Sequence, residues 1–147
     1  YVALLCSMDV LYVQEALREE TLSGAPKKAR KIGFIDPFIC HAVKRWLSPE
    51  YPEDLSTASQ LVESCVVSHF KRRYPTFYIK AEGEVDVAYV DQKKFWPIEV
   101  KWTNQLRPKD LKQILKYPNA RIWTKFASEK IESLEVEPLS LALFKLP

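Results

Sequence analysis

The chain has 147 residues, of which 47% are hydrophobic and 28% are charged, and its formal net charge is +3. This length predicts one domain, or one domain with a small appendage, and the composition supplies enough apolar material for a core. Wholesale disorder is therefore excluded. The slight basic excess permits nucleic-acid binding without requiring it.

Several classes of protein are excluded by what the sequence lacks. No run of eighteen apolar residues occurs, so we expect neither a transmembrane helix nor a membrane partner. With only three glycines, the chain contains neither a GxxxxGK[ST] phosphate loop nor a GxGxxG turn. Cys6, Cys40 and Cys65 form no CxxC pair, and we expect them to be core residues of a cytoplasmic protein. The opening at Tyr1 has neither an initiator Met nor a signal peptide, which predicts that the chain begins inside a longer protein.

The first 50 residues predict a small N-terminal segment. A helix is expected over residues 1–7, followed by strands at Val10–Val13 and Ile32–Ile35 around a polar stretch from Glu19 to Lys31. This order is typical of the last part of a winged helix, with the polar stretch as the wing, and it also fits a plain β-hairpin with a solvated tip. In a wing, four cations would contact DNA phosphates: Lys27, Lys28, Arg30 and Lys31.

A second helix and a loop separate this segment from the main domain. The helix is predicted over Phe38–Leu47, and the proline-containing loop Ser48–Ser56 follows it. We therefore expect a division into residues 1–50 and residues 51–147.

The main domain opens with the clearest predicted helix, Ala58–Arg73, whose apolar residues recur at spacings of three and four. Thr57 and Gln60 match a capping box at its start. Glu63 falls at the edge of the apolar stripe, and a half-buried acid needs a partner. Three cations at the end of the helix either contact phosphates or complement the helix dipole: Lys71, Arg72 and Arg73.

The rest of the chain predicts strands with a helix between them. The strands are Thr76–Ala81, Val85–Val90, Phe95–Trp102 and Arg121–Lys125, and the helix is Lys109–Tyr117. A helical or irregular piece and a final element at Leu139–Leu146 come after them. In the third strand, Pro97 suggests a bulge or a strand start. The predicted fold class is a mixed α/β (α+β) sheet flanked by helices.

Two neighbouring strands carry the residues with chemical potential. Because alternate residues of a strand share a face, Glu99 and Lys101 point the same way, roughly 6.6 Å apart along the strand. On the preceding strand, Val85 and Val87 are expected on one face and Asp86 on the other. If the strands pair across the turn at residues 91–94, Asp86 stands beside Glu99.

Two neighbouring carboxylates repel each other and invite a divalent cation, for which oxygen ligands suit Mg²⁺ or Mn²⁺. The predicted metal ligands are Asp86 and Glu99, with the main-chain carbonyl of Val100, and Glu63 could complete the shell. Lys101 is placed to orient the attacking water or to balance charge in the transition state. The alternative is an ordinary strand whose polar residues lie on its solvated face.

These residues resemble a known superfamily. Asp86 and the run Glu99-Val100-Lys101, with Glu63 on the preceding helix, resemble the PD-(D/E)xK nucleases, which implies a restriction-endonuclease-like fold. Gln113 and Tyr117 lie one helical turn apart and resemble the QxxxY helix of RecB-type exonucleases. An ordinary amphipathic helix with a polar Gln is the alternative for this second motif.

A closer resemblance covers the chain from Tyr1 to about Leu146. The order of four motifs resembles that in prokaryotic, often archaeal, AAA-type ATPases, which combine a P-loop ATPase module, a winged helix and a C-terminal nuclease-like domain. The resemblance implies that the chain begins inside the winged helix and that ATP would bind only in an upstream module of the same protein. The motifs are Lys31–Pro37, Leu61–Glu63, Gly83–Asp86 and Pro97–Lys101.

Three functions follow from this reading. The first is Mg²⁺- or Mn²⁺-dependent hydrolysis of DNA, with Gln113 and Tyr117 lining the catalytic site beside the carboxylates and Lys101. The second is a catalytically silent module of the ATPase that binds DNA or docks a protein. The third is an interaction scaffold, if any of the four tryptophans forms an exposed patch. The expected partners are DNA and the ATPase module, and a homo-oligomer is left open.

Overall fold

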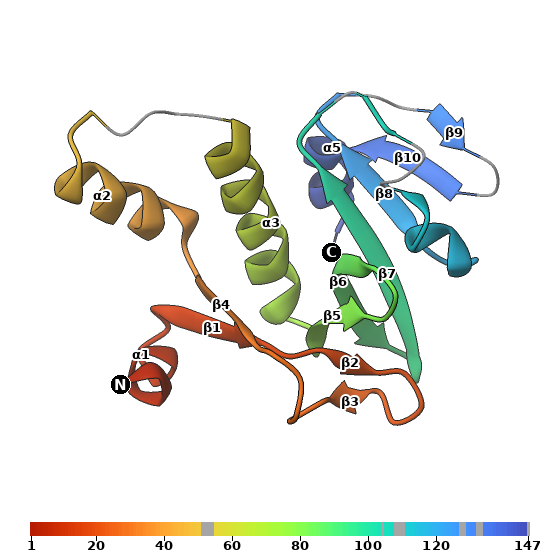
Figure 1. The fold of residues 1–147 in the computed structure, drawn as a ribbon, viewed down its shortest axis with the longest axis horizontal. Coiled ribbons are helices and arrows are strands. Elements are labelled where there is room, and N and C mark those ends of the chain that lie inside the picture. The colour runs from red at the N-terminus through yellow and green to blue at the C-terminus, as the bar shows by residue number, and fades with distance from the viewer. Residues whose placement is uncertain (51–54, 104, 108–110, 127–128, 132–133, 147) are drawn as a thin grey trace.

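The computed structural model describes residues 1–50, 55–103, 105–107, 111–126, 129–131 and 134–146. Their elements run in the order α1 (Val2–Ser7), β1 (Leu11–Gln14), β2 (Leu17–Arg18), β3 (Ser23–Gly24), β4 (Lys31–Phe34), α2 (Pro37–Leu47), α3 (Leu55–Lys71), β5 (Thr76–Lys80), β6 (Glu84–Asp91), β7 (Lys94–Lys101), η1 (Ile114–Lys116), β8 (Arg121–Thr124), β9 (Glu129–Ile131), β10 (Leu134–Pro138) and α5 (Leu139–Lys145). The main sheet has six strands in the order β5-β6-β7-β8-β10-β9 (Figure 1). The predicted mixed α/β class is confirmed. Within the described residues, no helix is long and apolar enough to cross a membrane.

The N-terminal helix and strand pair are confirmed, but the stretch between the strands is not a free loop. β1 and β4 pair antiparallel, and the ring of Tyr12 covers Gly33 on the opposite strand. Between them, β2 and β3 form a second small hairpin. The chain at the start of this hairpin docks on the edge of the main sheet, where the Tyr78 amide donates to the Glu15 carbonyl at 3.0 Å. The N-terminal segment is thus packed against the main domain.

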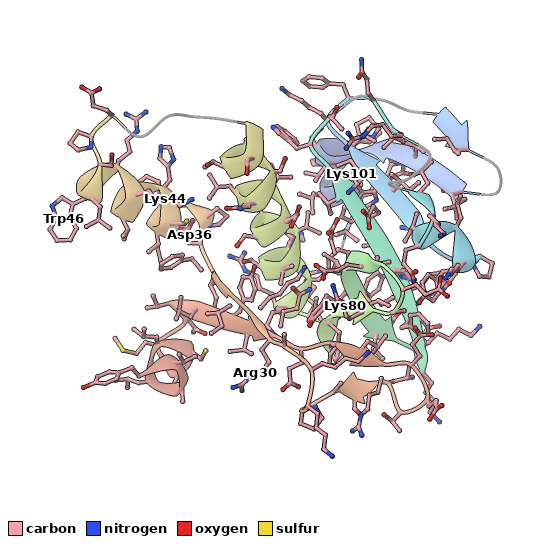
Figure 2. The ribbon with its side chains drawn as sticks, viewed as in Figure 1. Arg30, Asp36, Lys44, Trp46, Lys80 and Lys101 are labelled. Atoms are coloured by element: carbon pink, nitrogen blue, oxygen red, sulfur yellow. The ribbon has the colours of Figure 1, made fainter. Side chains whose placement is uncertain are left out.

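Helix α2 begins where the sequence predicts a helix. Asp36 caps it, because its carboxylate accepts a hydrogen bond from the Phe38 amide at 2.8 Å, and Pro37 occupies the first helical position. None of the helix's residues is buried. Phe38 is 71% exposed and Trp46 is 83% exposed, and Trp46 points away from the rest of the molecule (Figure 2). One of the four tryptophans is therefore on the surface, whereas Trp123 is buried in the core.

Helix α3 lies between α2 and the sheet (Figure 1). It begins at Leu55, so Thr57 is inside its first turn and the predicted capping box is wrong; residues 51–54 lie outside the described part. Phe70 packs its ring against Tyr89 at a centroid distance of 4.5 Å and against Trp123 at 5.7 Å. This aromatic stack joins the end of the helix to the sheet.

The strands of the sheet follow the prediction as far as β8. β5, β6 and β7 form an antiparallel meander, and β8 joins β7 in parallel. Gln92 and Lys93, both with positive φ, make the tight two-residue turn between β6 and β7. The pairing of β7 with β8 begins only at Ile98, so Pro97 is tolerated where β7 is still an edge on that side. β7 therefore runs through Pro97 as one strand.

Two predicted elements differ in the second half. Of the helix expected over Lys109–Tyr117, the described residues show α-helical backbone at Leu111 and the short 3₁₀ turn η1 at Ile114–Lys116; residues 108–110 lie outside the description. The piece expected to be helical or irregular contains β9 and β10 instead. β10 pairs in parallel with β8, and its buried Leu134 and Val136 alternate with Glu135 as a strand requires.

Candidate active site

A break in register places Asp86. Phe77 pairs with Ala88, but Ile79 pairs with Val85. Between these two pairs, β5 has one residue and β6 has two, so β6 contains one extra residue. This bulge puts Val85 into the core cluster on one face of the sheet and Val87 into the cluster that packs on α3. The expectation that Val85 and Val87 share a face is therefore wrong, and Asp86 lies at the bulge itself.

Asp86 also marks the point where β6 and β7 part. The paired register of the two strands runs up to Val87 and Ile98, and beyond it the Asp86 carboxylate accepts the Val100 amide at 2.9 Å. On the other side, the buried amide of Gln14 in β1 donates to the Asp86 carbonyl at 3.0 Å and to the Phe77 carbonyl at 2.9 Å. The Asp86 main chain is thereby held by a residue 72 positions earlier in the chain.

Glu99 and Lys101 point the same way from β7, as predicted. The Lys101 ammonium lies 2.7 Å from one oxygen of Glu99, and the Glu99 side chain is only 5% exposed. The other oxygen, Oε2, is buried and has no hydrogen-bond partner among the described residues. Such an unpaired carboxylate oxygen is costly to bury, so this position favours either a proton or a cation.

Burial and mutual repulsion dominate the electrostatics of the carboxylates. Burial, with the Asp86 charge, raises the pKa of Glu99 to about 8 against the lowering effect of Lys101. Burial and the Asp86 charge likewise raise the pKa of Glu63, on α3, to about 7. Burial also raises the pKa of Asp86, although the Val100 amide and Lys101 oppose the shift. The three acids therefore interact, and near neutral pH the group holds at least part of its protons.

The residues fit a divalent cation by their chemistry. Two interacting carboxylates with an unpaired oxygen, together with the neighbouring Val100 carbonyl, are the oxygen ligands that Mg²⁺ and Mn²⁺ prefer. However, within the described part of the chain, no group of three His, Cys, Asp or Glu side chains lies close enough to hold an ion by itself. A cation here would need main-chain oxygen and water as well.

The acids line two separate cavities of similar size. Asp86 and Glu63 line one of about 330 Å³ between β1, β4, α2 and α3. Glu99 and Lys101 line another of about 330 Å³ beside the turn between β5 and β6. The hydrogen bond from Val100 to Asp86 connects the two sets of residues. A larger cavity of about 1230 Å³ lies between α1, β1 and α3 and contains none of the acids, so we do not assign the chemistry to it.

Gln113 lies in the site, but Tyr117 turns away from it. Gln113 lines the cavity of Glu99 and Lys101, and its side-chain oxygen accepts the Gly83 amide at 3.2 Å. Tyr117 is 3.4 Å from Gln113, yet its hydroxyl donates to Glu19 at 2.8 Å, which ties η1 to the segment between β2 and β3. Burial and this hydrogen bond raise the pKa of Tyr117 to about 12. The pair is thus adjacent, as the spacing predicts, without both residues facing one cavity.

The predicted phosphate-binding cations are dispersed. Lys31 turns inward and pairs with Glu84, and Lys28 donates to the Lys80 carbonyl at 2.6 Å. The Lys71 ammonium donates to the Val13 carbonyl at 3.1 Å, so this lysine ties α3 to β1. The other cations lie exposed on the surface: Lys27, Arg30, Arg72 and Arg73.

Sequence reasoning missed Gln14 and Glu84. Gln14 shares the inward face of β1 with Tyr12, and a polar amide on an apolar face signals buried partners. Glu84 pairs with Lys31 and Lys80. The sequence signal for Glu84 was its place two residues before Asp86, since alternate residues of a strand share a face.

The fold and the site define a mixed α/β domain with a buried carboxylate–lysine cluster where two antiparallel strands part. Residues 58–133 match the family described as a domain of unknown function, DUF4143, and the chain belongs to this family. This domain is commonly found at the C-terminus of AAA-type ATPases. No curated protein and no solved structure matches the chain.

Proposed function

We propose that the chain is a PD-(D/E)xK nuclease-like domain, with a restriction-endonuclease-like sheet and the end of a winged helix before it, that belongs to an AAA-type ATPase. Its reaction would be Mg²⁺- or Mn²⁺-dependent hydrolysis of DNA phosphodiester bonds. The observation that carries the proposal is the buried Glu99, paired with Lys101 and interacting with Asp86 and Glu63, whose second oxygen has no partner among the described residues.

The proposed roles bring together residues that line two cavities and that the hydrogen bond from Val100 to Asp86 connects. Asp86 and Glu99 would hold the cation, with the Val100 carbonyl and Glu63 as further oxygen donors. The bound cation would supply a more acidic water for attack on phosphorus. The Lys101 ammonium, 2.7 Å from Glu99, would hold that water or balance the charge of the transition state. With a pKa of about 7, Glu63 can exchange a proton near neutral pH.

The raised pKa of Glu99 adds a condition to metal binding. Because its pKa is about 8, Glu99 is largely protonated at pH 7 and must lose that proton to bind a cation. Mg²⁺ binding should therefore release a proton at pH 7 and tighten as the pH rises towards 9. Calorimetry in buffers of different ionisation enthalpy measures this proton directly.

Cleavage of single- and double-stranded DNA in Mg²⁺ tests the proposed function. Asp86→Asn removes the charge but keeps an oxygen that can accept the Val100 amide, and Lys101→Met removes the ammonium. We expect each to lower cleavage by at least about 100-fold. Glu135→Gln, on the exposed side of β10, is the matched control and should cut at the parent rate. Parent-rate cleavage by Asp86→Asn, or cleavage by the parent in EDTA, would contradict the assignment.

The alternative is a silent docking module, and one observation favours it. Helix α2 leaves three large apolar side chains exposed, Phe38, Trp46 and Leu47, of which Trp46 is 83% exposed. The partner would be the ATPase module, to which this kind of domain is commonly joined. Under this alternative, Trp46→Ser weakens binding of the separately produced ATPase module while Asp86→Asn does not. The nuclease proposal expects Asp86→Asn to affect cleavage instead.

A further inference from the structure

The cavity beside Asp86 and Glu63 has a basic wall. It is bounded by β1, β4, α2 and α3, and its lining includes the cations Lys31 and Lys44 together with the polar side chains of Gln60 and Ser64. At about 330 Å³ it is at the small end of ligand sites. An anion in this cavity would face two acids, so it needs cations as neighbours.

Lys31 is the cation whose contacts point to this place. It is on β4, directly across from Gln14, whose amide holds the Asp86 main chain. Its ammonium pairs with Glu84 and lies 4.9 Å above the ring of Tyr78. The charges of Glu84, Asp86 and Glu63 all act on it, and its side chain is 36% exposed. Lys31 is therefore a half-buried cation among the acids of the proposed site.

Glu84, the partner of Lys31, has a second cation to balance its charge. Glu84 also pairs with Lys80, whose ammonium lies 3.1 Å from the second carboxylate oxygen. If Lys31 turned from Glu84 to another anion, Lys80 would still compensate the Glu84 charge. Lys31 can thus exchange partners without leaving a bare carboxylate behind.

We propose that Lys31 binds a phosphate of the DNA strand in this cavity, so that the β1–β4 hairpin completes the site. This inference rests on the proposed function. It places part of the site in residues that precede the matched segment 58–133, and it moves Lys31 from an exposed wing to the neighbourhood of the acids. A lysine is suited to this role, because its ammonium makes charge-assisted hydrogen bonds to phosphate oxygens.

The test measures the salt dependence of DNA binding rather than cleavage. A fluorescent single-stranded oligonucleotide is titrated with the full chain at pH 6.5 in EDTA at several KCl concentrations. Lys31→Met removes the charge at similar length, and Lys31→Arg keeps it. Lys145→Met is the matched control, because Lys145 is also an exposed lysine paired with a glutamate, Glu137, but lies on α5 and does not line the cavity.

We expect Lys31→Met to weaken binding about tenfold. The slope of log K against log salt should fall by about 0.7, the value for one lost phosphate contact on a single strand. Lys31→Arg should restore the slope, and Lys145→Met should leave affinity and slope unchanged. A structural role for Lys31 would not change the slope, and urea unfolding of Lys31→Met checks that the chain is folded.

Several results would overturn the inference: an unchanged slope for Lys31→Met, an equal loss for Lys145→Met, or no binding of the oligonucleotide by the parent. The failure of the proposed function looks different. If the parent binds DNA through Lys31 but does not cleave it in Mg²⁺, hydrolysis fails and the phosphate site stands. If the parent cleaves DNA and Lys31→Met binds and cleaves like it, the phosphate site fails and hydrolysis stands.

Discussion

Substituting Glu99 by Gln tests the electrostatics of the site through stability. In the folded state the pKa of Glu99 is about 8, against an ordinary value of 4.5, mainly because of burial and the Asp86 charge. Between these two pH values the folded chain keeps a proton that the unfolded chain has lost. Without metal, the stability of the parent must therefore fall as the pH rises from 4.5 to about 8. Gln cannot ionise, so the stability of the Glu99→Gln variant should not fall for this reason as the pH rises.

The size of the effect follows from the two pKa values. At 1.36 kcal/mol per pH unit, the gap between 4.5 and about 8 corresponds to roughly 5 kcal/mol. Because the Glu99 side chain is only 5% exposed, solvent screens this cost little. The charge of Glu63 contributes to the raised pKa of Glu99. Glu63 can take up a proton when Glu99 ionises, which lowers the cost of that ionisation. Since a small part of this loss has already occurred by pH 5, we expect the parent to lose about 3 to 4 kcal/mol more than Glu99→Gln between pH 5 and pH 9.

The assay is urea unfolding in EDTA at pH 5 and pH 9, with tryptophan fluorescence as the signal that monitors unfolding. The comparison uses the pH-dependent difference, so the cost of burying the Gln amide cancels. Glu135→Gln removes an exposed carboxylate and should keep the pH dependence of the parent. Mg²⁺ at 100 times its Kd should restore about 2.7 kcal/mol at pH 9 in the parent and not in Glu99→Gln.

Equal losses in the parent and in Glu99→Gln would refute this reasoning. That result would mean that Glu99 ionises at little cost, so that burial and the Asp86 charge do not control it. The unpaired Oε2 of Glu99 would then no longer support the proposal that a cation binds there.

Three further predictions test other parts of the structure. Lys101→Met leaves Glu99 without its cation, and urea unfolding should show a loss of about 2 kcal/mol at pH 9 and little at pH 5, where Glu99 is protonated. Phe70→Ala removes the ring that stacks between α3 and the sheet, and should cost about 3 to 5 kcal/mol in urea at either pH. Gly33→Ala places a methyl group against the Tyr12 ring, so calorimetric melting should show a loss of about 1 to 3 kcal/mol; an unchanged Tm would mean that Tyr12 moves without cost.

Local patterns predicted the part of the fold that contains the site. The spacing of apolar residues in α3 indicated a helix against a core, and two residues of that series, Val66 and Phe70, are buried there. Alternation in β7 placed Glu99 and Lys101 on one face, and their ion pair confirms it. These features depend on residues close in the chain, which is why a single sequence contains them.

Elements that depend on distant partners were not predictable in the same way. β10 is short, and its place is fixed by parallel pairing with β8, a contact that no local pattern specifies. Gln113 and Tyr117 have helical spacing, and the partners of their side chains, Gly83 and Glu19, are likewise distant in the chain.

The bulge at Asp86 shows why the site itself needs the structure. Alternation assumes one residue per step, so it puts Val85 and Val87 on one face, whereas the extra residue of β6 separates them. What holds the bulge is far away in sequence, since the Gln14 amide bonds the carbonyl of Asp86.

The same contacts bear on the division of the chain at residue 50. Independent domains have few contacts across their boundary. Here the amide of Tyr78 donates to Glu15, its hydroxyl donates to the Ala29 carbonyl at 2.6 Å, and Gln14 bonds Asp86. These bonds satisfy polar groups that would otherwise be left unpaired at the edge of β5 and at the bulge. Because the acid at the centre of the site is held from both sides of residue 50, any chemistry at Asp86 belongs to the β1–β4 hairpin and the main sheet together.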